Sequence, residues 1–178
     1  MNIISERLLL RAIEESDLEM IHQWSNDPRI ASHLAAIHLP SSFYQQKKWF
    51  EDMQSQKDTF RLAIQLIEDG TLLGYIGLWH INWFDRIAEF GFLIGDPENH
   101  GKGYGTEATR ALIRYAFETL DLMRIYTFVL ETNLPSLRSC EKSGFKVEGL
   151  ARSHAFRDGK RVNVVLLGVL REDFYNLK

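Results

Sequence analysis

The spacing of apolar residues changes period along the chain, and each change predicts a different element. The clearest helical pattern follows Gly103, where apolar positions recur at i, i+3, i+4, i+7 and i+8, namely Ala108, Ala111, Leu112, Tyr115 and Ala116. This spacing predicts an amphipathic helix from Gly103 to Leu120. The next segment, Arg124 to Leu130, is apolar at both alternating sets of positions and contains β-branched residues, which predicts a central, buried strand.

The first third of the chain is predicted to hold two helices. Leu8 to Ile13 has strand character and leads to a helix that we expect to begin at Ser16, because Ser16 and Glu19 have the spacing of a capping box. A second helix is expected from Phe43 to Met53. The residues between them, 27 to 39, are irregular and predict a loop or a short helix. That stretch holds two histidines, His33 and His38.

The remaining segments predict strands and one more helix. Strands are expected at Phe60–Ile67, Leu72–Trp83, Ile87–Ile94, Phe145–Phe156 and Val162–Leu170, and a helix at Pro135–Lys142. Gly144 is suited to ending that helix, and Asp158-Gly159 is typical of a tight hairpin turn. The order of elements predicts a mixed α/β (α+β) fold around one sheet. Residues 1–178 show no repeat or linker and are expected to form a single domain.

Composition and charge exclude several classes of protein. A net charge of −3 over 178 residues argues against a nucleic-acid partner, which would favour a basic face. The one cysteine, Cys140, excludes an intramolecular disulfide and a Cys-x-x-Cys metal site. The first residues lack the basic and apolar segments of a signal peptide, and no apolar run approaches the roughly 20 residues of a membrane span. We therefore expect a cytoplasmic enzyme with no membrane partner and no metal.

A glycine-rich loop precedes the predicted helix. Gly101, Gly103 and Gly105 fall within five residues, so backbone N–H groups can turn inward toward an anion at the positive end of the helix. This arrangement is typical of a phosphate or pyrophosphate site; the alternative is a glycine-rich turn without a ligand. The loop lacks the GxxxxGK and Ser/Thr of a P-loop, and Thr106 replaces the last glycine of a dinucleotide fingerprint. A nucleotide-binding protein is therefore the weaker alternative.

The loop resembles motif A of the GNAT acetyltransferase superfamily, (Gln/Arg)-x-x-Gly-x-(Gly/Ala), with His100 in the Gln/Arg position. The segment from Asn133-Leu134-Pro135-Ser136 to Glu141-Lys142-Ser143-Gly144-Phe145 is similar to motif B of that family. Glu6 to Arg11, together with Glu148-Gly149 and Asp158-Gly159-Lys160, resembles the branch of RimJ/RimL-like protein N-terminal acetyltransferases and spermidine acetyltransferases. The resemblance covers essentially the whole chain.

The resemblance implies a GNAT-like acyl-CoA N-acyltransferase fold, with a splayed central sheet flanked by helices and acetyl-CoA as the cosubstrate. Backbone groups of Phe92, Leu93 and Ile94 are then expected to pair with the pantetheine arm. The loop residues expected to hold the pyrophosphate are His100, Gly101, Lys102, Gly103, Tyr104, Gly105 and Thr106. Asn133 and Ser136 are expected on the other wall of the cleft. Lys102, Arg138 and Lys142 are candidates for the outer phosphates, or are plain solvated charges. A homodimer is common among proteins of the resembled family, and the sequence leaves the oligomeric state open.

Acetyl transfer to an amine needs a base and a route for protonating the leaving thiolate. Glu89 is the best candidate for the base; its alternative role is an ion pair with Arg86 or Arg124. His80 and Asn82 are weaker candidates, and His80 is expected to be a packed histidine. Cys140 stands where many members of the resembled family have a tyrosine, and it is either the general acid or a small packed residue.

The acceptor is expected to be a primary amine, either a protein N-terminus or a small molecule. An α-amine has a pKa near 8 and a lysine-like amine one near 10.4, so the second needs more help from a base. A spermidine or polyamine acetyltransferase and a non-catalytic acyl-CoA sensor are the alternatives. Four tryptophans are expected to wall the acceptor side, namely Trp24, Trp49, Trp79 and Trp83.

Overall fold

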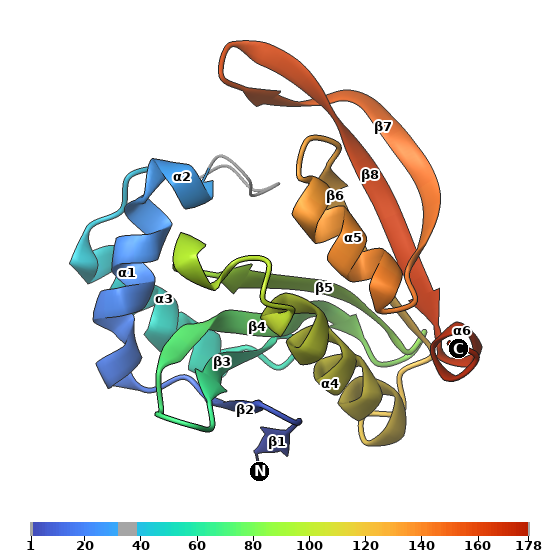
Figure 1. Ribbon diagram of the computed structural model, residues 1–178, viewed down its shortest axis with the longest axis horizontal. Coiled ribbons are helices and arrows are strands. Elements are labelled where there is room, and N and C mark those ends of the chain that lie inside the picture. The colour runs from blue at the N-terminus through green and yellow to red at the C-terminus, as the bar shows by residue number, and fades with distance from the viewer. Residues whose placement is uncertain (1, 32–38, 178) are drawn as a thin grey trace.

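The computed structural model describes residues 2–31 and 39–177, which form one sheet of eight strands with helices on both faces (Figure 1). The strands are β1 (Ile3–Ile4), β2 (Leu8–Ala12), β3 (Phe60–Leu66), β4 (Leu72–Asn82), β5 (Ile87–Ile94), β6 (Arg124–Leu130), β7 (Lys146–Arg157) and β8 (Lys160–Leu170). Their order in space is β1-β2-β3-β4-β5-β6-β8-β7, and all neighbours are antiparallel except β5 and β6. The mixed sheet confirms the predicted fold class.

Helices cover both faces of the sheet. They are α1 (Leu18–Asn26), α2 (Pro28–Ala31), α3 (Phe43–Ser55), α4 (Tyr104–Glu118), α5 (Leu134–Lys142) and α6 (Arg171–Tyr175), with short 3-10 turns η1 (Glu15–Asp17) and η2 (Pro97–Asn99). Leu112 of α4 shares a buried cluster with Phe90, whereas Trp24 of α1 shares another with Leu93. Phe90 and Leu93 point to opposite faces of β5, because successive side chains of a strand alternate.

The sheet opens between β5 and β6. These two strands pair only from Ile87 to Glu89 on β5 and from Arg124 to Tyr126 on β6. Beyond Glu89, β5 continues to Ile94 and remains paired with β4, while β6 continues to Leu130 paired with β8. The two strands therefore diverge, as the resemblance implied, and the edge of β5 that faces β6 carries no strand partner there.

The predicted start of the first helix was wrong. Asp17, not Ser16, makes the capping contact: its carboxylate accepts a hydrogen bond from the N–H of Glu14 at 2.9 Å. The same carboxylate binds the Arg11 guanidinium at 2.7 and 2.8 Å and is nearly buried. Glu14 and Asp17 thus form the capping box of the 3-10 turn that leads into α1, and Arg11 of β2 holds the Asp17 carboxylate in place.

The prediction that β6 is buried on both faces was wrong at Phe128, although Leu130 beyond it is buried. Ile125 and Val129 are buried, but the side chain of Phe128 on the other face is 43% exposed. The cause is the divergence of β5, which leaves this part of β6 without a neighbour on one side. The other predicted elements are confirmed to within one or two residues, and Asp158 and Gly159 both have the positive φ (48° and 74°) of the predicted hairpin turn.

His33 and His38 lie outside the described residues. Within residues 2–31 and 39–177, no helix has the length and apolarity needed to cross a membrane. In the same ranges, no group of three or more His, Cys, Asp and Glu side chains gathers as metal ligands would.

Candidate active site

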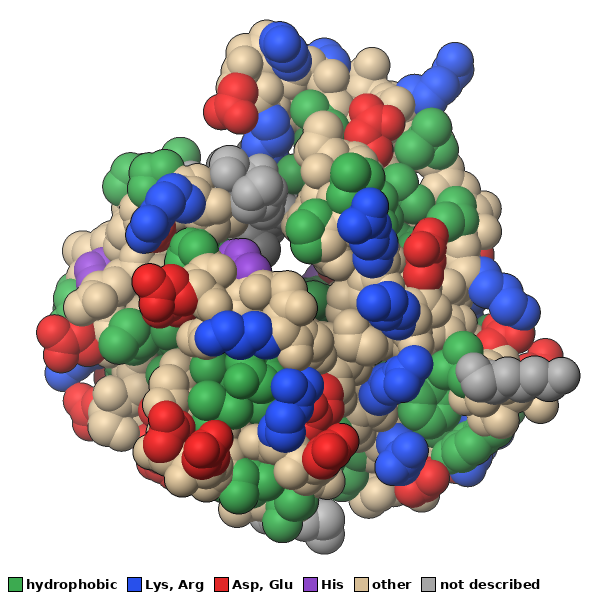
Figure 2. Space-filling model, in the orientation of Figure 1, with side chains coloured by type: hydrophobic (Ala, Val, Ile, Leu, Met, Phe, Trp, Pro, Cys, Tyr) green, Lys and Arg blue, Asp and Glu red, His purple; other side chains and the backbone are tan. Residues whose placement is uncertain are grey.

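A cleft of about 710 Å³ lies where β5 and β6 diverge. Its lining comes from α3, β3, β4, β5, β6 and α5, and it includes Trp49, Arg61, Trp79, His80, Glu89, Gly91, Phe92, Leu93, Phe128, Asn133, Ser136 and Cys140. In Figure 2 the surface is hollowed between α5 and the end of β5. Segments far apart in the sequence therefore meet around one solvent-accessible space.

The β5 wall of the cleft is formed by Gly91, Phe92 and Leu93. These residues pair with β4 on one side and have no β6 partner on the other. Ile94, which was grouped with them from the sequence, is not among the lining residues, and its carbonyl accepts a hydrogen bond from Nε2 of His100 at 2.9 Å. The free edge of β5 available to a ligand therefore ends near Leu93.

The glycine-rich loop has the backbone shape of an anion site. Gly101 and Gly103 have φ of +75° and +86°, values that favour glycine, and Gly103 is the residue before the first turn of α4. The first helical bond of α4 joins the N–H of Glu107 to the carbonyl of Gly103 at 3.0 Å. The amides of residues 104–106 consequently have no partner inside the helix and are available to an anion.

The side chains of the loop hold it in place. His100 is tied to Ile94 as described, and Nζ of Lys102 donates to Oδ1 of Asn99 at 3.1 Å. The hydroxyls of Thr106 and Ser139 lie 3.1 Å apart and link α4 to α5. A Cβ on Gly105 would lie 2.8 Å from the ring of Phe92, so this glycine lets α4 approach β5 closely.

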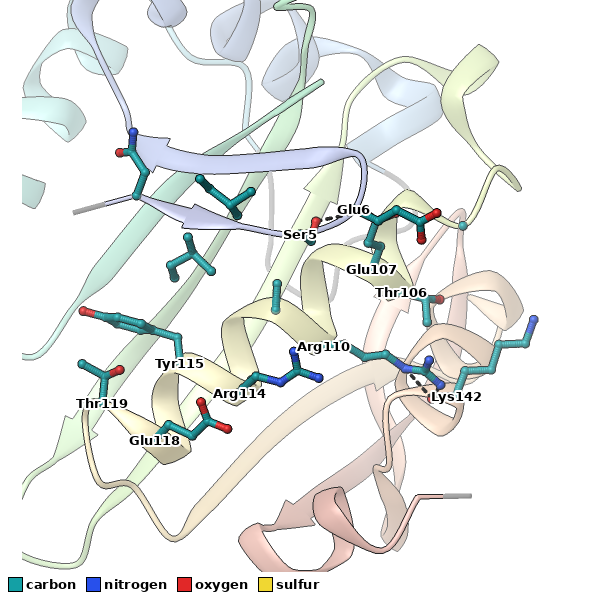
Figure 3. Close-up of a pocket in the computed structure, with 15 residues that line it drawn as sticks. Ser5, Glu6, Thr106, Glu107, Arg110, Arg114, Tyr115, Glu118, Thr119 and Lys142 are labelled. Atoms are coloured by element: carbon teal, nitrogen blue, oxygen red, sulfur yellow. Dashed lines mark hydrogen bonds between the residues drawn. The ribbon is translucent and has the colours of Figure 1, made fainter. Parts of the chain in front are cut away.

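A brace that the sequence reasoning missed connects α4 to the start of the chain. The Glu107 carboxylate accepts hydrogen bonds from the Ser5 hydroxyl (2.8 Å) and from the N–H and Nε of Arg7 (both 2.7 Å). Arg7 in turn donates to the carbonyl of Lys102 at 3.1 Å and lies 4.6 Å from the ring centre of Tyr104. Figure 3 shows Ser5 and Glu107 beside a second pocket of about 630 Å³ along α4. The family resemblance of the segment from Glu6 to Arg11 was the feature of the sequence that could have indicated this contact.

Replacing Glu107 with glutamine is expected to lower the free energy of unfolding by about 1–3 kcal/mol at pH 7, because charged hydrogen bonds are lost. Burial raises the pKa of Glu107, but its bonds to Arg7 and Ser5 and the Arg7 charge outweigh that effect and lower it. A lowered pKa stabilises the fold above the unfolded value of about 4.3, and the gain is lost as pH falls through the folded value.

The difference in the free energy of unfolding between wild type and Glu107→Gln should therefore be large at pH 7 and small at pH 3, as measured by urea unfolding. Glu98→Gln is the control, since Glu98 is exposed and makes no ion pair within the described part of the chain, and it should leave the free energy of unfolding unchanged at both pH values. An equal difference at pH 7 and pH 3 would contradict the assignment.

The opposite wall of the cleft comes from α5. Oδ1 of Asn133 accepts a hydrogen bond from the N–H of Ser136 at 3.2 Å, which caps the helix and directs its first turn toward the cleft. Cys140 lines the cleft floor but is only 1% exposed and belongs to the main core cluster. Burial raises the pKa of the Cys140 thiol to about 12, although a hydrogen bond with Ser136 opposes this. The thiol therefore stays protonated and gives up its proton reluctantly.

Glu89 faces the cleft and is paired with His80. Nδ1 of His80 and Oε2 of Glu89 lie 2.9 Å apart. The alternative role of Glu89, an ion pair with Arg86 or Arg124, is not what the structure shows, because Arg86 binds Asp121 at 2.5 Å and Arg124 binds Glu148. Glu89 is opposite Tyr126 in the last paired row of β5 and β6, so it stands where the two strands separate.

The expectation of a packed His80 was also wrong. Its side chain is 70% exposed, and its φ is +51°, at a bulge in β4 where the register with β5 shifts between Trp79 and Asn82. The bulge turns the imidazole out of the strand and across to Glu89. Asn82 does not line the cleft; its amide nitrogen donates to Asp85 at 2.7 Å and stabilises the following turn.

Two of the four tryptophans line the cleft. Trp49 and Trp79 do so, whereas Trp24 is buried beneath Gly95, and Trp83 is 53% exposed outside the lining. The sequence reasoning missed Arg61, whose guanidinium carbon lies 5.6 Å from the Trp49 ring centre and 5.5 Å from that of Trp79. Burial lowers the pKa of Arg61, with a smaller opposing effect of Tyr75.

Three comparisons place this geometry among known proteins. A family model described as an acetyltransferase (GNAT) domain matches residues 7–146. A prophage-derived N-acetyltransferase of Bacillus subtilis is 31% identical, with 95% of this chain and 93% of that one covered. A spermidine N(1)-acetyltransferase of Vibrio cholerae is 27% identical over 97% of this chain and 98% of that one. The crystal structure of spermidine N-acetyltransferase from Vibrio cholerae in complex with CoA and spermine matches with a TM-score of 0.88 and 28% identity, covering 97% of this chain and all of that one (100%).

Proposed function

The chain belongs to the GNAT acetyltransferase family, and we propose that it moves the acetyl group of acetyl-CoA onto the primary amine of a small molecule. Like other members of the family it is an acetyl-CoA-dependent N-acetyltransferase. The observation that carries the proposal is the juxtaposition of a free β5 edge with the glycine-rich start of α4. A homodimer, a cytoplasmic location and a protein N-terminus as the acceptor remain predictions.

The donor half of the cleft supports binding of acetyl-CoA. In the proposal, the pantetheine arm pairs with the free edge of β5 at Phe92 and Leu93, as an added strand would. The unpaired amides of residues 104–106 and the loop held by His100 receive the pyrophosphate. Asn133 and Ser136 border the arm from α5. Exposed Lys102, Arg138 and Lys142 supply positive charge for the outer phosphates.

The reaction that this arrangement supports is direct transfer. The neutral amine nitrogen attacks the thioester carbonyl carbon, which forms the C–N bond and places negative charge on the carbonyl oxygen. An N–H on the β5 edge can stabilise that charge. Breaking the C–S bond then releases the CoA thiolate, and the nitrogen gives its proton to a base. The products are the N-acetyl amine and CoA with a protonated thiol, so atoms and protons balance.

The His80–Glu89 pair is our candidate for the base. With the proton of Nδ1 donated to Glu89, the other ring nitrogen of His80 is left as an acceptor, and the carboxylate stabilises the imidazolium that forms. The bulge at His80 places this pair at the point where β5 and β6 separate, beside the free β5 edge. Its position supports proton removal from an amine attacking a thioester held on that edge.

Cys140→Ala is expected to keep kcat within about threefold of wild type. A thiol with a pKa near 12 is a poor acid toward a thiolate of ordinary pKa, so we assign the proton on the leaving group to water. The variant also removes a small buried side chain, so urea unfolding should show a modest loss of stability. Loss of kcat beyond about 100-fold in a variant that remains folded would show that Cys140 acts as the general acid.

The test of the proposal is release of the CoA thiol from acetyl-CoA, followed with a thiol-reactive dye. Amino acids, polyamines, aminoglycosides and short peptides with free N-termini serve as acceptors. Turnover on small amines is the expected result. Tight binding of acetyl-CoA by calorimetry with no turnover on any acceptor would overturn it in favour of a sensor. Turnover confined to peptides would overturn the small-molecule assignment.

A further inference from the structure

One positively charged side chain crosses the acceptor half of the cleft. Arg61 on β3, Gly77 on β4 and Gly91 on β5 are register partners, so they form one row on the same face of the sheet. A Cβ on Gly77 would lie 2.9 Å from Cγ of Arg61, so glycine at this position leaves the path of the Arg61 side chain open. Arg61 therefore extends over β4 toward the cleft, which it lines.

Two aromatic rings lie near this guanidinium. Trp49 of α3 and Trp79 of β4 lie at 5.6 and 5.5 Å from its central carbon. The Trp79 ring itself fits only because position 91 is glycine, where a Cβ would come within 2.4 Å of it. Cation–π contact with these two rings stabilises the charged guanidinium at the cleft, which Arg61 lines.

The guanidinium lacks an acidic partner. Throughout residues 2–31 and 39–177, no Asp or Glu carboxylate lies within ion-pair distance of Arg61, and no hydrogen bond is found for its side chain. A half-buried charge without a partner is costly unless a ligand supplies one, and a planar guanidinium suits an oxyanion bound by two parallel hydrogen bonds.

The acidic groups of the cleft lie elsewhere. Glu89 lies two residues before Gly91 on the same face of β5, and its carboxylate is paired with His80. Asp58, also in the lining, is exposed and precedes β3. The cleft thus offers two groups to an acceptor molecule: a proton-accepting pair at one position and a cation at another.

From this arrangement we infer that the acceptor is a small amine that also carries an oxyanion, carboxylate or phosphate, which Arg61 binds while the amine meets the His80–Glu89 pair. The inference rests on the proposed acetyl transfer and names its substrate class. A polyamine can give a proton to the His80–Glu89 pair but has no anion for Arg61. Each further ammonium group of the polyamine near Arg61 is repelled. Spermidine is therefore expected to be a poor acceptor, in contrast to what the name of the Vibrio cholerae relative states for that protein.

The test uses matched acceptors with acetyl-CoA and the thiol-release assay. The pairs are an amino acid with its amide and phosphoethanolamine with ethanolamine, and spermidine is added as the polycation. Rates are corrected for the fraction of neutral amine. Wild type should show kcat/KM at least about tenfold higher for the anionic member of one pair, and which pair responds distinguishes carboxylate from phosphate. Loss of one charged hydrogen-bond set corresponds to about 10- to 100-fold.

Variants at position 61 assign the preference to this residue. Arg61→Gln should raise KM for the anionic acceptor about 10- to 100-fold, leave KM for its neutral partner unchanged, and so abolish the preference. Arg61→Lys should restore part of it, since charge returns without the fork of donors. Arg152→Gln, at an exposed position of β7 outside the lining, is the control and should match wild type.

Different results would overturn the inferred acceptor class and the proposed acetyl transfer. Equal loss on anionic and neutral acceptors in Arg61→Gln, or preference of wild type for spermidine or the amides, would overturn the inference and leave acetyl transfer standing. Absence of turnover on every amine would overturn the proposed function and the inference with it.

Discussion

Replacing Glu89 with glutamine is expected to lower kcat about 100-fold at pH 7, the lower end of what a positioned base contributes. The substitution keeps the shape of the side chain but removes the charge that stabilises a protonated His80, 2.9 Å away. The rate should recover toward wild type as pH rises, because the amine then loses its proton to solvent. The pH optimum of kcat/KM should therefore move upward, and a pH–rate profile from pH 6 to 10 measures both effects.

A double-mutant cycle separates a working pair from two independent groups. If His80 and Glu89 act as a unit, His80→Gln alone should cost nearly as much as Glu89→Gln, and the double variant should lose little more than either. Glu148→Gln is the control: that carboxylate pairs with Arg124 on β6, has similar exposure and lies outside the cleft lining, so its kcat should stay at the wild-type value. Additive losses, or an unmoved pH profile, would exclude the pair as the base.

The sequence was informative where one segment carries its own signal. The period of Ala108, Leu112 and Ala116 predicted α4, and the glycines at its start predicted the turn that Gly101 and Gly103 form with positive φ, because both depend on residues close in the chain. The family resemblance added the divergence of β5 and β6, which the register confirms.

The sequence was uninformative where the pairing or packing of separate elements decides the outcome. His80 lies in an apolar strand, but a bulge with positive φ turns it to Glu89. Arg61 is one charged residue among many until the register places it beside Gly77 and packing places it near two tryptophan rings. Each of these depends on register or packing, which local spacing does not encode.

Gly101→Ala is expected to weaken acetyl-CoA binding about 10- to 100-fold. Gly101 has φ of +75°, and an alanine there is strained by about 1–2 kcal/mol. The loop can relieve that strain only by rotating the peptide that follows, which turns the N–H of Lys102 and alters the approach to α4. Loss of one or two charged hydrogen bonds to a pyrophosphate gives the expected range. Calorimetry with acetyl-CoA measures the change directly.

Gly159 provides a matched control for that loss, because backbone strain alone would affect both glycines equally. Its φ is +74°, and like Gly101 it has no atom within 4 Å of an added Cβ, but it lies at the tip of the β7–β8 hairpin. Gly159→Ala should therefore lower the free energy of unfolding by the same ~1–2 kcal/mol while leaving the affinity for acetyl-CoA unchanged. Equal affinities for the two variants would mean that the loop amides do not bind the pyrophosphate. A loss of affinity for acetyl-CoA in Gly101→Ala but not in Gly159→Ala would show that the left-handed backbone at Gly101 serves ligand binding rather than the stability of the fold.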